Sequence, residues 1–155
     1  MRHTGRSVLK DYEERWERAG ILDAAWGERL SLVANLQGDW NVERLSGPLP
    51  MPFVWKRIRN GRGETYVLPA PRARGVPLVP RFPFRLEQRE GHVVLIYTGL
   101  LSFLVDELRF EAGGSWLGRA NAAGIRYAWF AMTPIWTPER PGKLHNPSSR
   151  GYETF

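Results

Sequence analysis

The residues of this chain best suited to chemistry are one carboxylate and two phenols that stand in mostly apolar segments. Asp106 interrupts the apolar run 101–110, and Tyr97 and Tyr127 belong to two neighbouring apolar runs. A carboxylate among apolar side chains must be paired or hydrogen-bonded, or else it is held in a cavity where it can exchange protons. Phenol hydroxyls can hydrogen-bond to a ligand oxygen. Asp106, Tyr97 and Tyr127 are therefore the candidate catalytic residues, and an arginine partner for Asp106 is the alternative.

Side-chain alternation separates Asp106 from the charges beside it. Successive residues of a strand point to opposite faces, so Asp106 shares a face with Leu104 and Leu108, whereas Glu107 shares the other face with Arg109. The charged pair is expected on the solvent side. Asp106 is expected on the apolar side.

Histidine and cysteine offer little further chemistry. His92 precedes the apolar run 93–96, where it is either a turn residue or a general base, and no second ligand stands at metal-binding spacing from it. The chain has no cysteine, which excludes disulfides, thiolate catalysis and cysteine-based metal sites. No metal site is expected, and no phosphate loop or hydrolase motif is present.

Two helices and a run of strands must position these residues. Three-to-four spacing of apolar residues predicts helices over 7–19, ending at Gly20, and over about 22–36. From Gly38 the period changes to two, and turn residues recur about every ten positions. This pattern predicts a mainly β fold, an antiparallel up-and-down barrel with one or two N-terminal helices. The expected strands are 38–44, 53–59, 64–68, 84–89, 92–98, 101–111, 115–121 and 125–133.

Glycine and proline mark the boundaries of the barrel. Asn60-Gly61 is a strong hairpin signal, because both residues tolerate positive φ. Five prolines between 69 and 83 predict a long loop with one edge segment at most, near 76–79. The expected organisation is one structural domain of 155 residues, with a helical segment over 1–37, a barrel over 38–134 and an extended tail over 135–155.

Charge and location follow from composition. The net charge is +6, and most of the excess falls in the segment 53–89, where the basic residues are Lys56, Arg57, Arg59, Arg62, Arg72, Arg74, Arg81, Arg85 and Arg89. This segment indicates an anionic partner or a solvated face. No nucleic-acid-binding motif accompanies it, so nucleic acid ranks last among the expected partners. The chain shows neither an apolar leader nor a membrane span, which predicts a cytoplasmic protein.

The Gly38-Asp39-Trp40 sequence at the start of the first strand resembles the calycin superfamily of lipocalins and intracellular lipid-binding barrels. The stretch 97–118 is also similar to bacterial GXWXG-type domains. The resemblance implies that Gly38 and Trp40 close the barrel bottom and that an arginine of the last strands, Arg126 or Arg119, packs across the indole. Heme-binding relatives use a late histidine that this chain lacks, so no cofactor is expected.

The first functional hypothesis is binding of a small hydrophobic molecule, with an anionic group as one option, inside the barrel. Arg57 and Arg59 form a cationic anchor if their face points inward, but Val54 and Ile58 offer an equally apolar inner face, and both registers remain open. The alternative is a cyclase or isomerase of pericyclase type in the same cavity. A homodimer is also compatible. The candidate ligand-binding residues are Trp55, Arg57, Tyr66, Phe84, Tyr97, Phe103, Trp116 and Trp129.

Overall fold

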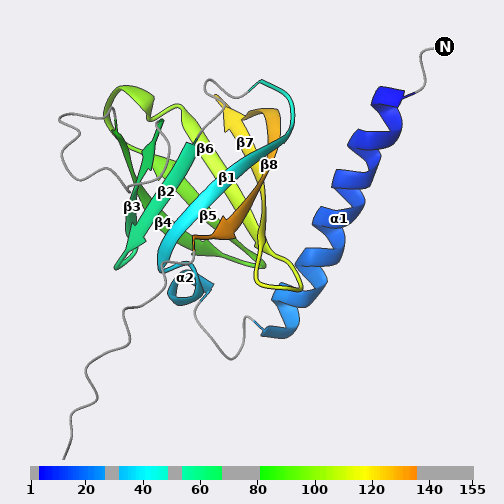
Figure 1. The fold of residues 1–155 in the computed structure, drawn as a ribbon, viewed down its shortest axis with the longest axis horizontal. Coiled ribbons are helices and arrows are strands. Elements are labelled where there is room, and N and C mark those ends of the chain that lie inside the picture. Colours follow the sequence, from blue (N-terminus) through cyan, green and yellow to red (C-terminus); the bar gives the residue numbers. More distant parts are fainter. Residues whose placement is uncertain (1–3, 27–31, 49–53, 68–80, 136–155) are drawn as a thin grey trace, which may run out of the picture.

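The protein folds into a closed antiparallel β-barrel with helices at one end and on one side (Figure 1). The computed structural model describes residues 4–26, 32–48, 54–67 and 81–135. Among these residues each strand pairs with the next in sequence, and the last strand pairs back with the first. The strands are β1 Gly38–Ser46, β2 Val54–Arg59, β3 Arg62–Tyr66, β4 Arg81–Arg89, β5 His92–Tyr97, β6 Leu104–Phe110, β7 Trp116–Ala122 and β8 Ile125–Pro134. The predicted fold class is confirmed.

The two helices differ in extent from the two that the sequence predicts. α1 spans Thr4–Trp26 and passes through Gly20, where an ending was expected, and α2 is a short helix, Leu32–Asn35. A Cβ atom at Gly20 would lie 2.4 Å from Nη1 of Arg109 on β6. The missing side chain lets α1 pack closely on the barrel, and this packing outweighs the helix penalty of glycine, about 0.5–1 kcal/mol.

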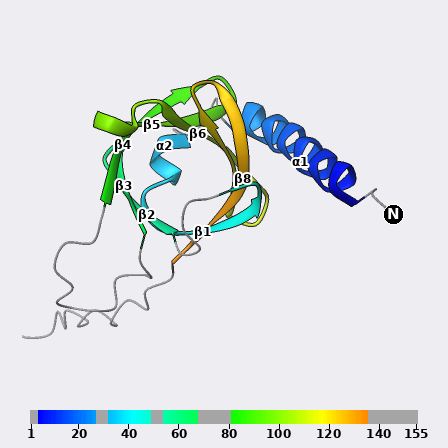
Figure 2. The ribbon, with the colours of Figure 1, turned by 90° about the horizontal axis from the view of Figure 1, so that it is seen from above.

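The two helices occupy different places around the barrel. Seen from above, α2 lies within the outline of the barrel and α1 lies outside it (Figure 2). Hydrogen bonds fix α2 and the residues that follow it to one end, since Leu32 N donates to Gln88 Oε1 at 3.0 Å and Asn60 N donates to Gln37 Oε1 at 2.7 Å. Within the part of the chain that the structure describes, neither helix has the length and apolar character needed to span a membrane.

Local turn chemistry explains most of the strand boundaries. Asn60 and Gly61 have φ angles of 51° and 75°, as the hairpin signal predicts. Pro83 was expected in the loop 69–83 but lies within β4, where its carbonyl accepts the Thr98 N–H at 3.1 Å. A proline lacks only the donor of its residue, so its carbonyl can still hold the strand in the sheet. A 3-10 helix, Gly99–Leu101, delays the start of β6 to Leu104.

Cross-strand register determines which side chains share the barrel interior. Trp40 pairs with Lys56, Lys56 with Thr65, and Leu95 with Asp106, and partners of this kind lie on the same face. The interior contains a buried apolar cluster that includes Leu36, Trp40, Ile58, Phe84, Leu95, Leu108, Trp116, Phe130 and Met132.

A second, smaller core joins α1 to the outer wall. Trp16, Leu117 and Trp129 form its buried centre, and Tyr12 and Leu45 pack around it. Arg109 and Arg119 of the barrel lie over the Trp16 ring, at 4.6 and 4.2 Å from its centroid.

Some expectations fall outside the described residues. These are the edge segment 76–79, most of the proline-rich loop 69–83, Phe53, and the tail beyond residue 135.

Candidate functional site

Four polar side chains meet inside the barrel and are called the interior cluster below: Lys56 of β2, Thr65 of β3, Tyr97 of β5 and Asp106 of β6. Lys56 Nζ donates to Thr65 Oγ1 at 2.8 Å, to the Tyr97 hydroxyl at 2.6 Å and to Asp106 Oδ2 at 3.1 Å. The Tyr97 hydroxyl donates to the same Asp106 oxygen at 3.0 Å. It also lies 3.0 Å from Thr65 Oγ1. The three protons of the ammonium group are therefore all used.

The interior cluster is almost completely removed from solvent. Lys56 is 2% exposed, Asp106 5%, and Thr65 and Tyr97 7% each. Taking an ammonium and a carboxylate out of water is costly, and the cost is recovered only where the geometry is good and further hydrogen bonds complete the pair. Thr65 and Tyr97 supply those hydrogen bonds. A buried pair of this kind contributes little net stability.

Aromatic rings enclose the ammonium group. Lys56 Nζ lies 5.3 Å from the centroid of the Phe84 ring and 5.9 Å from that of Phe130, within the range of cation–π attraction. Both rings lie over interior glycines, since a Cβ atom at Gly63 would be 2.4 Å from Phe84 Cζ and one at Gly118 would be 2.2 Å from Phe130 Cζ. The two glycines thus give the rings the space to approach Lys56.

Burial and charge change the acidity of two tyrosines in the interior. Burial, followed by the negative charge of Asp106, raises the pKa of Tyr97 well above its ordinary value of 10.0. Burial and Asp106 also raise the pKa of Tyr127, although Lys56 opposes this shift. Both phenols are therefore proton donors at neutral pH.

The interior cluster lies toward the end of the barrel opposite α2. Tyr97 is the last residue of β5, Thr65 is next to last in β3, and Asp106 is third in β6, and these strand ends point away from α2. The 3-10 helix and the β7–β8 turn stand at the same end, and Ala123 N of the turn donates to Phe103 O, between the 3-10 helix and β6, at 2.9 Å.

The structure brings several of the sequence-predicted site residues together. Asp106 and Tyr97 belong to the interior cluster, Phe84 lies beside it, and Tyr127 packs on the same interior core. Trp116 is also in the interior and fully buried, and its indole N–H has no hydrogen-bond partner within the described residues. The expected arginine partner of Asp106 is wrong, because Lys56 takes that position.

Three predicted ligand-binding residues lie on the outer wall instead. Trp55 and Tyr66 stack on each other with their centroids 4.0 Å apart, and Arg57 lies over the Trp55 ring at 5.2 Å. Arg57 donates two hydrogen bonds to Asp39, at 2.9 and 3.1 Å, and Arg59 donates one at 3.3 Å. The face that carries Ile58 and Lys56 points inward. Of the two registers that the sequence left open, the structure therefore has the one in which Arg57 and Arg59 form no cationic anchor inside the barrel.

Other predicted residues are also outside the interior. Phe103 is 52% exposed near the β7–β8 turn, and Trp129 is buried against α1 with its ring 5.9 Å from Trp16. Arg126 was expected to cross Trp40, but it lies over Trp129 at 5.0 Å and pairs with Glu13. The pairing of β7 with β8 skips Tyr127, and this bulge turns Arg126 to the outer face.

Gly38 and Trp40 lie where the chain enters the barrel from α2. Gly38 has a φ of 137°, which favours glycine, and the Trp40 indole N–H donates to Leu36 O at 2.9 Å. Trp40 is therefore buried at the α2 end of the barrel. The alternative partner for it, Arg119, lies outside over Trp16.

Lys56 and Thr65 are functional-site candidates that the sequence alone did not predict. Lys56 belongs to the basic segment 53–89. It also alternates with Val54 and Ile58, the two apolar residues that would point inward if Arg57 and Arg59 point outward. It is also one of only three lysines among 22 basic residues, with Lys10 and Lys143. An isolated lysine in an apolar alternation is a signal that could have identified it.

His92 is the first residue of β5 and lies beside the β4–β5 turn, at the α2 end. Its Nδ1 lies 2.9 Å from Glu90 O and its Nε2 lies 3.6 Å from Glu107 Oε1, on the outer wall. Over the described ranges, no group of three acidic or histidine side chains is arranged to hold a metal ion.

Comparison with known proteins identifies no family. No protein-family model matches the chain, and no curated protein matches it. A solved structure that does match is the solution NMR structure of protein yxeF, with a TM-score of 0.42 and 14% sequence identity over 68% of this chain and 75% of that one. A similarity of this size supports no conclusion about function.

Proposed function

We propose that the protein binds a small, mainly apolar molecule inside the barrel, and that the interior cluster receives a polar oxygen of that molecule. The observation that carries the proposal is the buried contact of Lys56 with both Tyr97 and Asp106. Binding sites in small barrels combine apolar walls with a few fixed polar groups. Here the walls include Phe84 and Phe130. The Gly38-x-Trp40 entry to β1 supports a calycin-like barrel as the setting.

The charge balance of the cluster favours a neutral oxygen over a carboxylate. Asp106 already neutralises Lys56, so a second carboxylate would have to displace it. A carbonyl or hydroxyl oxygen could instead exchange hydrogen bonds with Tyr97 and Lys56 without a change in net charge. The indole N–H of Trp116, which has no partner among the residues that the structure describes, adds a second polar group that faces the interior. Its burial without an acceptor costs about 1–3 kcal/mol, which a bound oxygen would recover.

The test compares matched ligands that differ only in the polar group. Long-chain alcohols, methyl ketones and fatty acids of equal length would displace an apolar fluorophore from the purified protein. We expect alcohol or ketone to bind more tightly than acid. Asp106→Asn leaves Lys56 without a counter-charge, so this variant should reverse the order and favour the acid. Equal affinity for all three probes, unchanged in the variant, would show that the cluster is not the binding site.

A second function, proton transfer in the same site, is favoured by the position of the Tyr97 hydroxyl. This hydroxyl is held between Lys56 and Asp106, at 2.6 and 3.0 Å. It could pass its proton to the oxygen of a bound carbonyl while the Asp106 carboxylate accepts the proton of the adjacent carbon, which forms the enol, and return of that proton from Asp106 to Tyr97 restores both groups. An isomerase or cyclase would use such a step. We would follow deuterium uptake from D2O at the carbons next to the carbonyl of a bound ketone. Tyr97→Phe should abolish uptake while binding persists; uptake that is equal in both proteins would reject the enzyme hypothesis.

A further inference from the structure

The outer face of β2, β3 and β4 carries three arginines that are direct cross-strand neighbours. Arg59 pairs in register with Arg62, and Arg62 pairs with Arg85. Like charges directly opposite each other in a sheet destabilise it. This arginine row, Arg59, Arg62 and Arg85, therefore opposes folding unless something negative lies beside it.

The acidic residues nearby leave part of this charge uncompensated. Asp39 is shared between Arg57 and Arg59, and its hydrogen bond with Arg57 is the main cause that lowers its pKa. Glu87 contacts Arg85 from the same strand. Arg62, at the centre of the row, has no acidic partner within the part of the chain that the structure describes.

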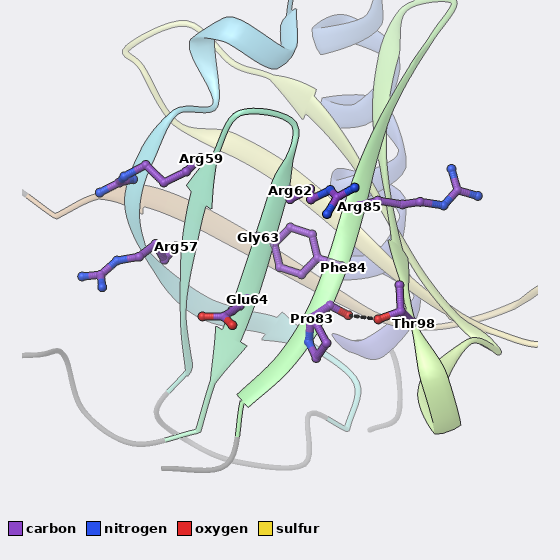
Figure 3. A pocket seen from close by; sticks show the side chains of 9 residues that line it. All are labelled: Arg57, Arg59, Arg62, Gly63, Glu64, Pro83, Phe84, Arg85 and Thr98. Atoms are coloured by element: carbon purple, nitrogen blue, oxygen red, sulfur yellow. Dashed lines mark hydrogen bonds between the residues drawn. The ribbon is translucent and has the colours of Figure 1, made fainter. Parts of the chain in front are cut away.

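A groove coincides with the arginine row. It has a volume of about 550 Å³, which falls within the range for small-molecule sites. Figure 3 shows its arginines on neighbouring strands, with Glu64 and Pro83 between them. The residues that line it are Arg57, Arg59, Arg62, Gly63, Glu64, Pro83, Phe84, Arg85 and Thr98.

We propose that this groove binds the phosphate groups of a phosphorylated ligand, at a site separate from the barrel interior. A guanidinium offers a planar fork of donors that fits two phosphate oxygens at once. Three such forks across adjacent strands suit a group that carries more than one negative charge. A free phosphorylated small molecule and the backbone of a single-stranded nucleic acid share this chemistry.

The experiment uses inorganic pyrophosphate as the probe and two variants of equal charge. Arg62→Gln with Arg85→Gln removes two cations from the groove, and Arg18→Gln with Arg44→Gln removes two exposed cations elsewhere. We expect pyrophosphate to shift amide NMR signals of residues 57–63 and 84–85. Its affinity should fall by about tenfold or more in the groove variant, because charge-assisted hydrogen bonds are lost, and should change little in the control.

Thermal unfolding gives an independent readout. Pyrophosphate should raise the Tm of the wild-type protein and of the control variant. The groove variant should unfold at a higher temperature than the wild type without any ligand, because the repulsion within the row is relieved, and should no longer respond to pyrophosphate. Equal loss of affinity in the two variants, or no response of the wild type, would overturn the proposal.

A single-stranded oligothymidylate distinguishes the two sources of phosphate. If it binds much more tightly than pyrophosphate, with a steep salt dependence that the groove variant reduces, the ligand is a nucleic acid. If pyrophosphate binding depends on the groove and the oligonucleotide binds no more tightly than pyrophosphate, the ligand is a small phosphorylated molecule. Oligonucleotide binding that both variants weaken equally would reflect net charge alone and would reject the groove as its site.

Discussion

The Lys56 ammonium nitrogen lies 2.6 Å from the Tyr97 hydroxyl oxygen, and both atoms are shielded from water. Asp106 Oδ2 is the third corner of this contact, at 3.1 Å from Lys56 Nζ and 3.0 Å from the hydroxyl. The three groups therefore act as a unit, and a change in any one of them alters the hydrogen bonds of the other two. Stability and binding can be separated by removing the groups singly and together.

Lys56→Met should destabilise the protein strongly. The substitution leaves the buried Asp106 carboxylate without its counter-charge, which typically costs about 3–5 kcal/mol. Replacing both partners, Lys56→Met with Asp106→Leu, should recover most of that loss, because no buried charge remains. Urea unfolding of the wild type, the two single variants and the double variant measures the coupling. Costs that simply add in the double variant would show that the pair does not interact.

The same double variant tests function apart from folding. It should remain folded. It should no longer discriminate between alcohol, ketone and acid probes, because the charged groups that are proposed to contact the polar oxygen of the ligand are gone. Retained discrimination in a folded double variant would place the binding site elsewhere in the molecule.

Alkaline titration should detect the ionisation of the Tyr97 phenol. Its pKa in the folded protein lies well above 10.0, the ordinary value that the unfolded chain has. The stability that depends on the neutral phenol is therefore complete below about pH 10 and is lost as the pH rises toward the folded-state pKa. Tyrosinate absorbance should show a late step that disappears in Tyr97→Phe. Tyr12→Phe, which removes a hydroxyl on the outer wall, should leave that step in place.

The fold could be predicted from the sequence because its signals are local. The period of two, the positive-φ turn at Asn60 and Gly61 and the regular spacing of glycines need no knowledge of distant residues. The end of α1 was misplaced because the preference of Gly20 for a helix end is weaker than the packing that Arg109 makes on it. That packing joins two segments far apart in the chain.

The site was only partly predictable because it depends on register. Side-chain alternation correctly placed Asp106 on the inner face. For residues 53–59 the sequence is compatible with either face pointing inward, and the pairing of Trp40 with Lys56 determines which face does. One extra residue at Tyr127 then reverses the face of Arg126. A bulge and a strand register are set by the closure of the whole barrel, which no short segment encodes.

Gly118→Ala should test the packing that brings Phe130 near Lys56. The added Cβ would lie 2.2 Å from Phe130 Cζ, so the ring must move. Overpacking of this kind costs about 1–3 kcal/mol. We expect a lower Tm and weaker binding of apolar probes, measured on the same sample. Phe130→Leu in the Gly118→Ala background should restore part of the stability; a double variant no more stable than Gly118→Ala alone would count against the predicted clash.

Trp16→Ala should detach α1 while leaving the barrel intact. Trp16 is 1% exposed, packs against Trp129 and lies beneath the guanidinium groups of Arg109 and Arg119. Loss of a buried aromatic side chain typically costs about 3–5 kcal/mol, and here the loss falls on the contact between helix and barrel. Amide hydrogen exchange should show faster exchange throughout α1.

Leu9→Ala is the matched control for this prediction, because Leu9 is on the same helix but 47% exposed. It should change exchange in α1 very little. The strands that carry the interior cluster should keep their protection in both variants, because their hydrogen bonds close around the barrel without α1. Loss of protection in β2 and β5 together with α1 would show instead that the helix and the barrel unfold as one cooperative unit.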